Sequence, residues 1–274
     1  MPVVSTNTAA NSALRYLNIN SADESSSVSK IASGSRITKA SDDAAGLAVG
    51  TSIQSDVTML NQASTNASNG ESILQAADGG MARIADILQR MESLATESDS
   101  GTVTDTERSY VDAEFQQLTS EVDSIASGTR FDSQSLLDGT GNWASGVTFL
   151  VGTSTSDTLT IQLTTVSSSA LGLSGTSVST ADGAVSAISV IQSAISTLST
   201  ARAKVGAQIS RFEYQSEMIS TSIENQTAAE SAIMDVDVAS EETNLANEDT
   251  LVQAGIDALS KANQLPSQLL KLLQ

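Results

Sequence analysis

The sequence contains no cysteine and no histidine, and aromatic residues make up only 3% of its 274 residues. Without cysteine the chain has no disulfide, no thiolate nucleophile and no thiolate zinc site. Without histidine it lacks the commonest general base and metal ligand. Most hydrolytic and metal-dependent mechanisms therefore miss a component. We expect no catalytic residue, no metal site and no cofactor, and we interpret the protein as a non-enzyme with an aliphatic core.

Positive charge is also scarce, since 13 Lys and Arg stand against 32 Asp and Glu, for a formal net charge of -19. An excess of this size repels the phosphates of nucleic acids and anionic lipid surfaces. We therefore expect no nucleic-acid partner and no membrane partner. The start of the sequence lacks the basic and apolar regions of a signal peptide, and no run is long enough to span a bilayer. An exported protein of this kind would need a route that reads no such signal.

The sequence is rich in apolar seven-residue repeats, which are typical of helices that bury one narrow seam against another helix. The longest repeat contains Ile191, Leu198, Val205, Phe212, Ile219, Gln226 and Ile233, preceded at three residues by Ile188, Ile195, Ile209 and Ile223. A helix from Ile188 to Ile233 would be roughly 70 Å long. Such a helix needs partners along its whole length, so we expect a component of an assembly.

A second repeat predicts another long helix in the first half of the chain. Its members are Ile53, Leu60, Ala67, Leu74, Met81, Leu88 and Ala95. Gly70 and the pair Gly79–Gly80 would each cost about 1 kcal/mol relative to alanine inside a helix. We therefore expect either a bend or close helix packing at these glycines.

The middle of the chain predicts a third helix and a small β region. Asp105 or Thr106 could cap the helix, which would end near Gly128. Its apolar face contains Val111, Phe115, Leu118, Val122 and Ile125. Short β-branched runs at 146–151 and 158–165 then predict one β-hairpin, the sole β region that we expect.

Both ends of the chain predict helices that are weak alone, because serine and threonine lower helix propensity and Ser21 and Glu24 interrupt the first apolar stripe. Pro266 could kink the last helix or limit its final turn. The predicted fold class is mainly α: an elongated antiparallel coiled-coil or helical-bundle rod with a small β-hairpin region in the middle of the chain.

Short motifs occur in a specific order at both ends of the chain. They are Ser33-Gly34-Ser35-Arg36-Ile37, Ala40-Ser41-Asp42-Asp43-Ala44-Ala45-Gly46-Leu47-Ala48, Asn66-Ala67-Ser68-Asn69-Gly70, Leu88-Gln89-Arg90 with Leu94-Ala95, Asp235-Val236-Asp237, Gln253-Ala254-Gly255, Ala262-Asn263-Gln264-Leu265-Pro266 and Leu272-Leu273. With these motifs and the apolar repeats between them, the chain resembles a bacterial flagellin. Because about fifty residues separate the third helix from the long repeat, it resembles a minimal flagellin without large outer domains.

The resemblance implies a division into two domains. Residues 1–39 and 244–274 would form an inner terminal coiled coil, the filament core, and residues 40–243 a rod domain with three long helices and a β insert at about 131–180. The implied function is a structural subunit that assembles into the flagellar filament for motility, with termini that order on polymerisation. The implied partners are copies of itself, hook-filament junction and cap proteins, a flagellar export chaperone and sibling flagellins. The implied location is extracellular, in the bacterial flagellum, after type III export.

The same resemblance assigns roles to three groups of residues. The polymer core interface would contain Leu14, Leu17, Val28, Ile31, Leu251, Ile256, Leu259, Leu265, Leu269 and Leu272. Packing in the rod domain would depend on Leu60, Leu74, Leu88, Ile191, Leu198, Val205, Phe212 and Ile219. Arg90, Leu94 and Glu114 match positions where some flagellins contact the innate Toll-like receptor. Since Glu92 and Glu97 replace the usual Arg and Gln, these three could equally form an inter-subunit surface.

Two acidic groups and three other functions remain as alternatives. Asp42 and Asp43 could be a carboxylate pair or helix caps, and Asp235 and Asp237 with Glu241 and Glu242 could bind calcium or form a solvated helix entry. A hook-filament junction protein would share the terminal helices, and an intracellular coiled-coil scaffold would share the repeats. An inserted zinc protease would need a His-Glu-x-x-His helix, which a chain without histidine cannot supply.

Overall fold

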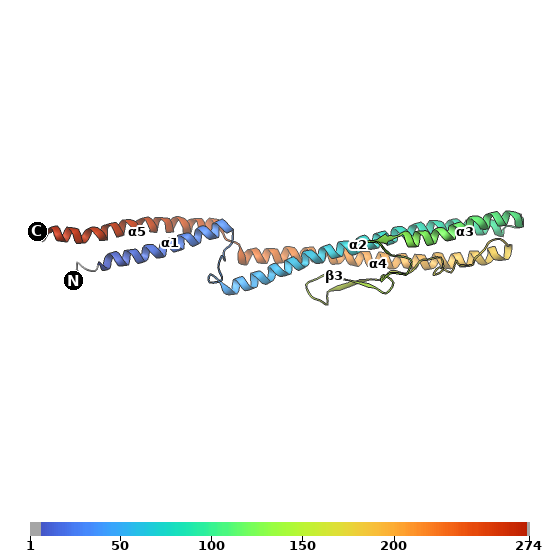
Figure 1. Ribbon diagram of the computed structural model, residues 1–274, viewed down its shortest axis with the longest axis horizontal. Coiled ribbons are helices and arrows are strands. Elements are labelled where there is room, and N and C mark those ends of the chain that lie inside the picture. Colours follow the sequence, from blue (N-terminus) through green and yellow to red (C-terminus); the bar gives the residue numbers. More distant parts are fainter. Residues whose placement is uncertain (1–6, 273–274) are drawn as a thin grey trace. The chain divides into compact units, whose positions relative to one another are not determined.

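The computed structural model describes the backbone of residues 7–272 and the side chains of residues 7–265 (Figure 1). The helices in this part of the chain are α1 (Thr8–Ser33), α2 (Ala44–Asp99), α3 (Asp105–Gly128), α4 (Ala181–Met234) and α5 (Val238–Leu272). The strands are β1 (Arg130–Phe131), β2 (Gln134–Ser135), β3 (Val147–Leu150) and β4 (Thr158–Ile161). The prediction of a mainly helical protein of long packed helices, with a small β region in the middle of the chain, is confirmed.

The chain divides into two units. The terminal unit comprises Met1–Val57 and Asn225–Gln274, and the central unit comprises Thr58–Glu224. Both α2 and α4 contribute residues to each unit. The predicted domain limits at residues 39 and 244 concern the assembled filament and stay a prediction.

In the terminal unit, α1 and α5 lie side by side and run antiparallel (Figure 1). Near one end of the pair, Asn7 Nδ2 donates to the Ala262 carbonyl at 2.8 Å, and near the other Lys30 Nζ lies 3.3 Å from Glu241 Oε1. The Asn7 side chain also caps α1, whose last turn ends at Gly34 in the left-handed conformation, with φ 71°. The α5 helix continues past Pro266, so this proline does not end it.

The segment after α1 lies against the junction between α4 and α5. Gly34 accepts a hydrogen bond from the Val236 N–H at 3.0 Å, and the Arg36 N–H donates to the Met234 carbonyl at 2.6 Å. The Arg36 guanidinium donates to the Ile233 carbonyl, at 3.0 Å from Nε and 2.6 Å from Nη2. A cation here satisfies carbonyls that the end of α4 leaves unpaired.

Asp42 and Asp43 have different partners close to the start of α2. Asp43 Oδ1 accepts from the Gly46 N–H at 2.8 Å, while Asp42 Oδ2 accepts from the N–H groups of Thr38 and Lys39. The hydrogen bond from Lys39 is the main cause that lowers the pKa of the Asp42 carboxyl. The structure therefore favours the capping interpretation for Asp43, while Asp42 holds the turn that precedes the helix.

The core of the central unit forms where α2, α3 and α4 pack together. The predicted rod-packing residues Leu60, Leu74, Leu88, Ile191, Leu198, Val205, Phe212 and Ile219 are all buried there. Each apolar side chain of this size stabilises the fold by about 1.5–3 kcal/mol when it is fully buried. An ion pair between Arg202 Nε and Asp78 Oδ1, at 2.9 Å, also joins α4 to α2.

The glycines of α2 explain how closely its neighbours approach. The helix is continuous through Gly70, Gly79 and Gly80. A Cβ atom added at Gly70 would lie 2.6 Å from Phe212 Cε1, and one at Gly80 would collide with Thr129. Gly79 has nothing within 4 Å. Close packing accounts for Gly70 and Gly80.

The predicted hairpin is present as β3 and β4, which pair antiparallel with Val147 opposite Ile161 and Leu150 opposite Thr158. The Phe149 ring meets Phe212 of α4 edge-on, with centroids 5.9 Å apart. A second pair, β1 and β2, was not predicted, so the expectation of a single β region was wrong. Each of these strands has two residues, too few to show an alternating pattern.

The start of α3 also differs from the prediction by one residue. Thr104 is the cap, and its side chain and that of Glu107 form a reciprocal capping box. The Thr-x-x-Glu spacing was the sequence signal for this cap. Behind it, the buried Arg108 donates from Nε to the Ser98 carbonyl at 2.8 Å and pairs with Asp105.

By length and composition alone, α4 contains a stretch apolar enough to cross a membrane, contrary to the expectation that no such run exists. Its heptad residues from Ile191 to Ile219 are buried in the central core. A single helix of this kind is weak evidence for a membrane span, because the core helix of a soluble protein passes the same test of length and composition.

Candidate assembly surface

The seam between α1 and α5 contains polar and charged residues. Ser27 is 3% exposed, and Lys30 and Glu241 form an ion pair beside it. Asn244 donates to Glu241 Oε2 at 3.2 Å, and further along the seam Glu248 Oε2 is buried without a hydrogen-bond partner. Polar and charged seam residues fix the register of paired helices but contribute less stability than leucine would.

The pKa of Glu241 reflects this seam. Burial alone would raise the pKa of the carboxyl. The hydrogen bonds from Asn244, Ser27 and Lys30 and the positive charge of Lys30 outweigh burial, so the pKa of Glu241 is lowered. The carboxylate is therefore held charged between the two helices.

The apolar side chains of the same pair point outward. Among the predicted interface residues, Leu14, Val28, Leu251, Ile256 and Leu265 are each 45–52% exposed. Leu17, Ile31 and Leu259 are half-buried, and Leu17 packs over Gly255. The predicted residues Leu269 and Leu272 lie outside the described side chains. The terminal pair thus leaves several apolar residues on its outside and holds a mixture of polar and apolar residues in its own seam.

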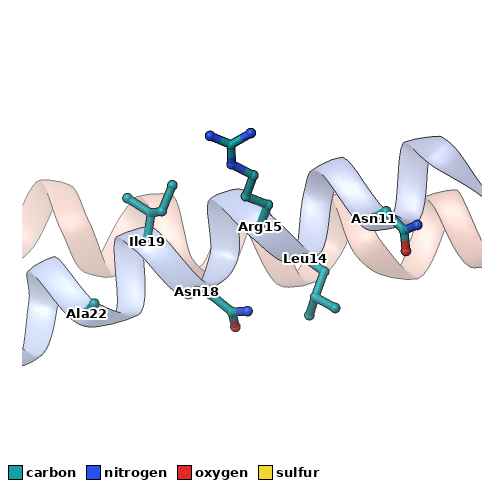
Figure 2. Close-up of a pocket in the computed structure, with 6 residues that line it drawn as sticks. All are labelled: Asn11, Leu14, Arg15, Asn18, Ile19 and Ala22. Atoms are coloured by element: carbon teal, nitrogen blue, oxygen red, sulfur yellow. The ribbon is translucent and has the colours of Figure 1, made fainter.

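One part of this outward surface is an open hollow of about 510 Å³ on α1, lined by Asn11, Leu14, Arg15, Asn18, Ile19 and Ala22 (Figure 2). Figure 2 shows Leu14 and Asn18 pointing to one side of the helix and Arg15 and Ile19 to the other. Ile19 is as exposed as Leu14. A mixed apolar and amide surface of this kind suits a protein partner.

The three residues of the predicted receptor or inter-subunit surface are placed differently from one another. Arg90 and Glu114 are exposed and form an ion pair between α2 and α3, with Nη2 2.7 Å from Oε1. Leu94 is 2% exposed and lies in the core side of α2. Of the three, only Arg90 and Glu114 are exposed enough to contact another protein.

Among the described side chains, those of residues 7–265, no cluster of three or more Asp, Glu, His or Cys is arranged to hold a metal ion. Two of the acidic residues at the start of α5 have other partners. Asp237 Oδ1 accepts from the Ala239 N–H at 3.2 Å as a helix cap, and Glu241 pairs with Lys30. Calcium binding by Asp235, Asp237, Glu241 and Glu242 is therefore not supported.

The sequence reasoning missed the polar seam itself. The signal was available, because Glu24, Ser27 and Lys30 lie at positions of α1 that turn toward α5. These polar residues indicated a weak helix. The sequence alone does not show that Glu241 of α5 is the partner of Lys30.

A packed core and a helix pair with exposed apolar residues are features of a structural protein that associates with others. The family profile for the bacterial flagellin N-terminal helical region matches residues 4–142, and that for the bacterial flagellin C-terminal helical region matches residues 188–273. The chain belongs to the bacterial flagellin family and is a short member without large outer domains. Flagellins are the structural, non-enzymatic subunits of the flagellar filament, and the flagellum is where this protein is located.

Full-length relatives agree with this assignment. The chain is 35% identical to a flagellin of Halalkalibacterium halodurans, over 99% of this chain and 100% of the relative. It is 34% identical to the flagellar filament 30.7 kDa core protein of Treponema maltophilum, over 99% of both chains.

Among solved structures, the crystal structure of Bacillus cereus flagellin is 27% identical and has a TM-score of 0.52 over 61% of this chain and 94% of that one. A putative flagellar hook-associated protein from Vibrio parahaemolyticus has a TM-score of 0.59 over 71% of this chain and 100% of that one. At 12% identity, the second likeness concerns the fold alone.

Proposed function

We propose that the outward apolar faces of α1 and α5 are the surfaces through which copies of this chain form the core of the filament. In this proposal residues 1–39 and 244–274 are the inner terminal domain, and residues 40–243 are the rod domain around it. The observation that carries the proposal is the exposure of apolar side chains on the terminal pair, with Leu14, Val28, Leu251, Ile256 and Leu265 outside. Leu17, Ile31 and Leu259 border the same faces, and Leu269 and Leu272 would extend them.

Energetics support assembly coupled to ordering of the terminal helices. Each half-exposed leucine or isoleucine that a neighbour covers would contribute about 1 kcal/mol, at roughly 25 cal/mol for each Å² buried. The polar and charged residues in the seam limit the stabilisation that α1 and α5 gain from each other. Helices of this kind are marginal alone and gain their stability from packing. We therefore infer that the terminal helices become fully stable only when neighbouring subunits bury their outer faces.

Further partners follow from family membership and remain proposals. A filament needs a junction to the hook and a cap at its growing end, and an aggregation-prone terminal helix needs protection before export. Hook-filament junction proteins, cap proteins and an export chaperone are therefore expected partners, and sibling flagellins could share the filament. For the Arg90–Glu114 surface we favour contact with a neighbouring subunit over an innate receptor, since Glu92 beside it adds negative charge.

A hook-filament junction protein is the second candidate function. The likeness to the hook-associated protein favours it in fold only, whereas the relatives named as flagellins or filament core proteins match from end to end. The two functions differ in the length of the polymer that the chain forms alone. An intracellular scaffold differs from both in location, and finding the protein in sheared surface material would exclude it.

The test is negative-stain electron microscopy of the purified chain after sulfate is added, because sulfate strengthens the burial of apolar surface. We expect long, uniform filaments. Monomers or short stubs, even with filament fragments added as seeds, would contradict the filament function and favour the junction protein or the scaffold.

A further inference from the structure

The two antiparallel helices of the terminal pair each turn one stripe of residues toward the other. Along both stripes, buried or half-buried residues recur at alternating steps of three and four. The stripes contain Ala10, Ala13, Leu17, Asn20, Glu24, Ser27 and Ile31 on α1 and Glu241, Leu245, Glu248, Val252, Gly255, Leu259 and Ala262 on α5. This spacing is that of an antiparallel coiled coil. Most members are small or apolar, so the glutamates in both stripes require an explanation.

The register of the pair places Glu24 opposite Glu248. Leu17 packs over Gly255, where an added Cβ atom would lie 3.3 Å from Leu17 Cδ1. Because residue numbers rise along α1 as they fall along α5, two helical turns from this contact bring Glu24 level with Glu248. Two further turns reach Glu241, whose ion pair with α1 agrees with this register.

No cation accompanies these two opposed glutamates. Glu248 Oε2 is buried and has no hydrogen-bond partner. Asp23 and Asp249, their neighbours in sequence, are exposed and add two more negative charges. Among the described side chains, none of these four carboxylates forms an ion pair. The four residues form the acidic layer of the terminal pair, and their like charges weaken the pairing of the helices unless a cation joins them.

Arg15 is a cation of the same helix pair that has no ion-pair partner among the described side chains. It is exposed, and Figure 2 shows its guanidinium extended away from α1 beside the hollow that it lines. At 1.5 Å per residue it lies roughly 13 Å along α1 from Glu24, so it does not neutralise the acidic layer of its own chain. Lys30, the other basic residue of α1, is already paired with Glu241. Arginine binds carboxylates through a planar fork of donors and is enriched in protein interfaces.

We propose that the acidic layer of one copy binds the Arg15 guanidinium of a neighbouring copy. Donor and acceptor lie at different heights of the helix pair, so each copy gives its arginine to one neighbour and receives an arginine from another. A contact between two unlike surfaces repeats without closing, as a filament requires. The incoming cation also offsets the repulsion between Glu24 and Glu248, so that binding of a neighbour and pairing of α1 with α5 favour each other. This inference rests on the proposed filament function and adds residues that recognise each other between copies.

The test is a double-mutant cycle on full-length chains, with the critical concentration for filament growth measured after seeding with wild-type fragments. One variant carries Arg15→Ala, a second carries Glu24→Gln and Glu248→Gln, and a third carries all three substitutions. Lys261→Ala, with and without the two glutamines, is the matched control, since it removes another exposed positive charge from the terminal pair. Circular dichroism of the free chains should show no loss of helix, because Arg15 is exposed and glutamine removes a repulsion.

We expect Arg15→Ala to raise the critical concentration by about tenfold when both glutamates are present, the usual size of a lost hydrogen bond to a charged group. When both glutamates are glutamine, the same substitution should change it by less than about twofold, because its partner is already gone. Lys261→Ala should change the critical concentration by the same factor in both backgrounds, since independent sites are additive.

An equal effect of Arg15→Ala in the two backgrounds would overturn the inference. So would an effect of Lys261→Ala that depends on the glutamates in the same way, because the acidic layer would then respond to any positive charge nearby. A loss of helix in the free glutamine variant would also overturn it, by giving the acidic layer a structural role within one chain. Failure of the wild-type chain itself to extend the fragments would instead overturn the filament function.

Discussion

The two units of this flagellin use the same kind of helix in opposite ways. In the central unit the apolar residues of each heptad face other helices of the chain, and Leu74, Leu88 and Ile191 are fully buried. In the terminal unit the seam holds an ion pair and a buried serine, and leucines such as Leu14 and Leu251 face outward. The direction in which the apolar side chains point therefore separates a unit built to fold by itself from one built to be covered by a partner.

The largest effect should come from removing part of the terminal unit. Deletion of Gln264 to Gln274 should abolish filament growth and leave the thermal unfolding of the central unit unchanged, because none of its core residues lies in that segment. Electron microscopy with added sulfate and circular dichroism would measure the two properties. A truncated chain that still grows filaments would show that this segment is not needed for the polymer.

Substituting one buried residue of the central unit and one exposed residue of the terminal unit should separate effects on monomer stability from effects on polymerisation. Phe212→Ala empties a buried site beside Phe149 and should lower the free energy of unfolding by about 3–5 kcal/mol. Leu14→Ala should change it by less than about 0.5 kcal/mol, since Leu14 is exposed in the monomer. Leu14→Ala should nevertheless weaken polymerisation. Urea unfolding and sedimentation of filaments would measure both, and a similar loss of monomer stability in the two variants would contradict the comparison.

A smaller effect is expected at the glycines of α2. Gly70→Ala forces a methyl group against the Phe212 ring and should lower the free energy of unfolding by about 1–3 kcal/mol. Gly79→Ala, in the same helix with nothing near its Cβ, should raise it by up to about 1 kcal/mol. Urea unfolding of the two variants would measure both changes in the free energy of unfolding, which should have opposite signs. Equal destabilisation would mean that α2 and α4 are not packed closely at Gly70.

The smallest effect concerns pH and the terminal seam. Since the pKa of Glu241 is lowered in the folded state, its carboxylate stabilises the α1–α5 pair above its ordinary value of 4.5, and this contribution is lost as the pH falls through the lowered pKa. Helicity followed by circular dichroism on acidification should therefore fall by an increment that Glu241→Gln lacks. Identical pH profiles for the two chains would assign the acid sensitivity to other carboxylates.

The heptads predicted most of this fold because they are local in sequence and repeat many times. Ile191 to Ile219 and Leu60 to Leu88 are buried in the core for that reason. The β3–β4 hairpin likewise lies within the two runs of β-branched residues that predicted it. The outward direction of Leu14 and Leu251 follows from the position of α5 beside α1, and neither stripe alone indicates it.

Features that depend on contacts between distant segments were not predictable. Asp112 of α3 accepts from the Val178 N–H at 2.7 Å, and Asp123 accepts from the Ser168 N–H at 2.8 Å, so two acidic residues hold the segment before α4 on α3. Nothing in the spacing of single aspartates indicates such partners. The opposition of two glutamates in the α1–α5 seam likewise follows only from the register of the two helices.

The pairing of α1 with α5 has a consequence for the order in which the chain can acquire structure. The hydrogen bond between Asn7 and Ala262 joins residues 255 positions apart, whereas the central unit is one continuous segment between them. During synthesis or delivery from the amino end, the central unit can fold while α5 is still absent. The terminal pair can form only after nearly the whole chain has arrived, since closing so long a loop requires both of its ends. Only complete chains could therefore be incorporated into the filament through this pair. A prematurely ended subunit would have a folded central unit but no α5 to pair with α1.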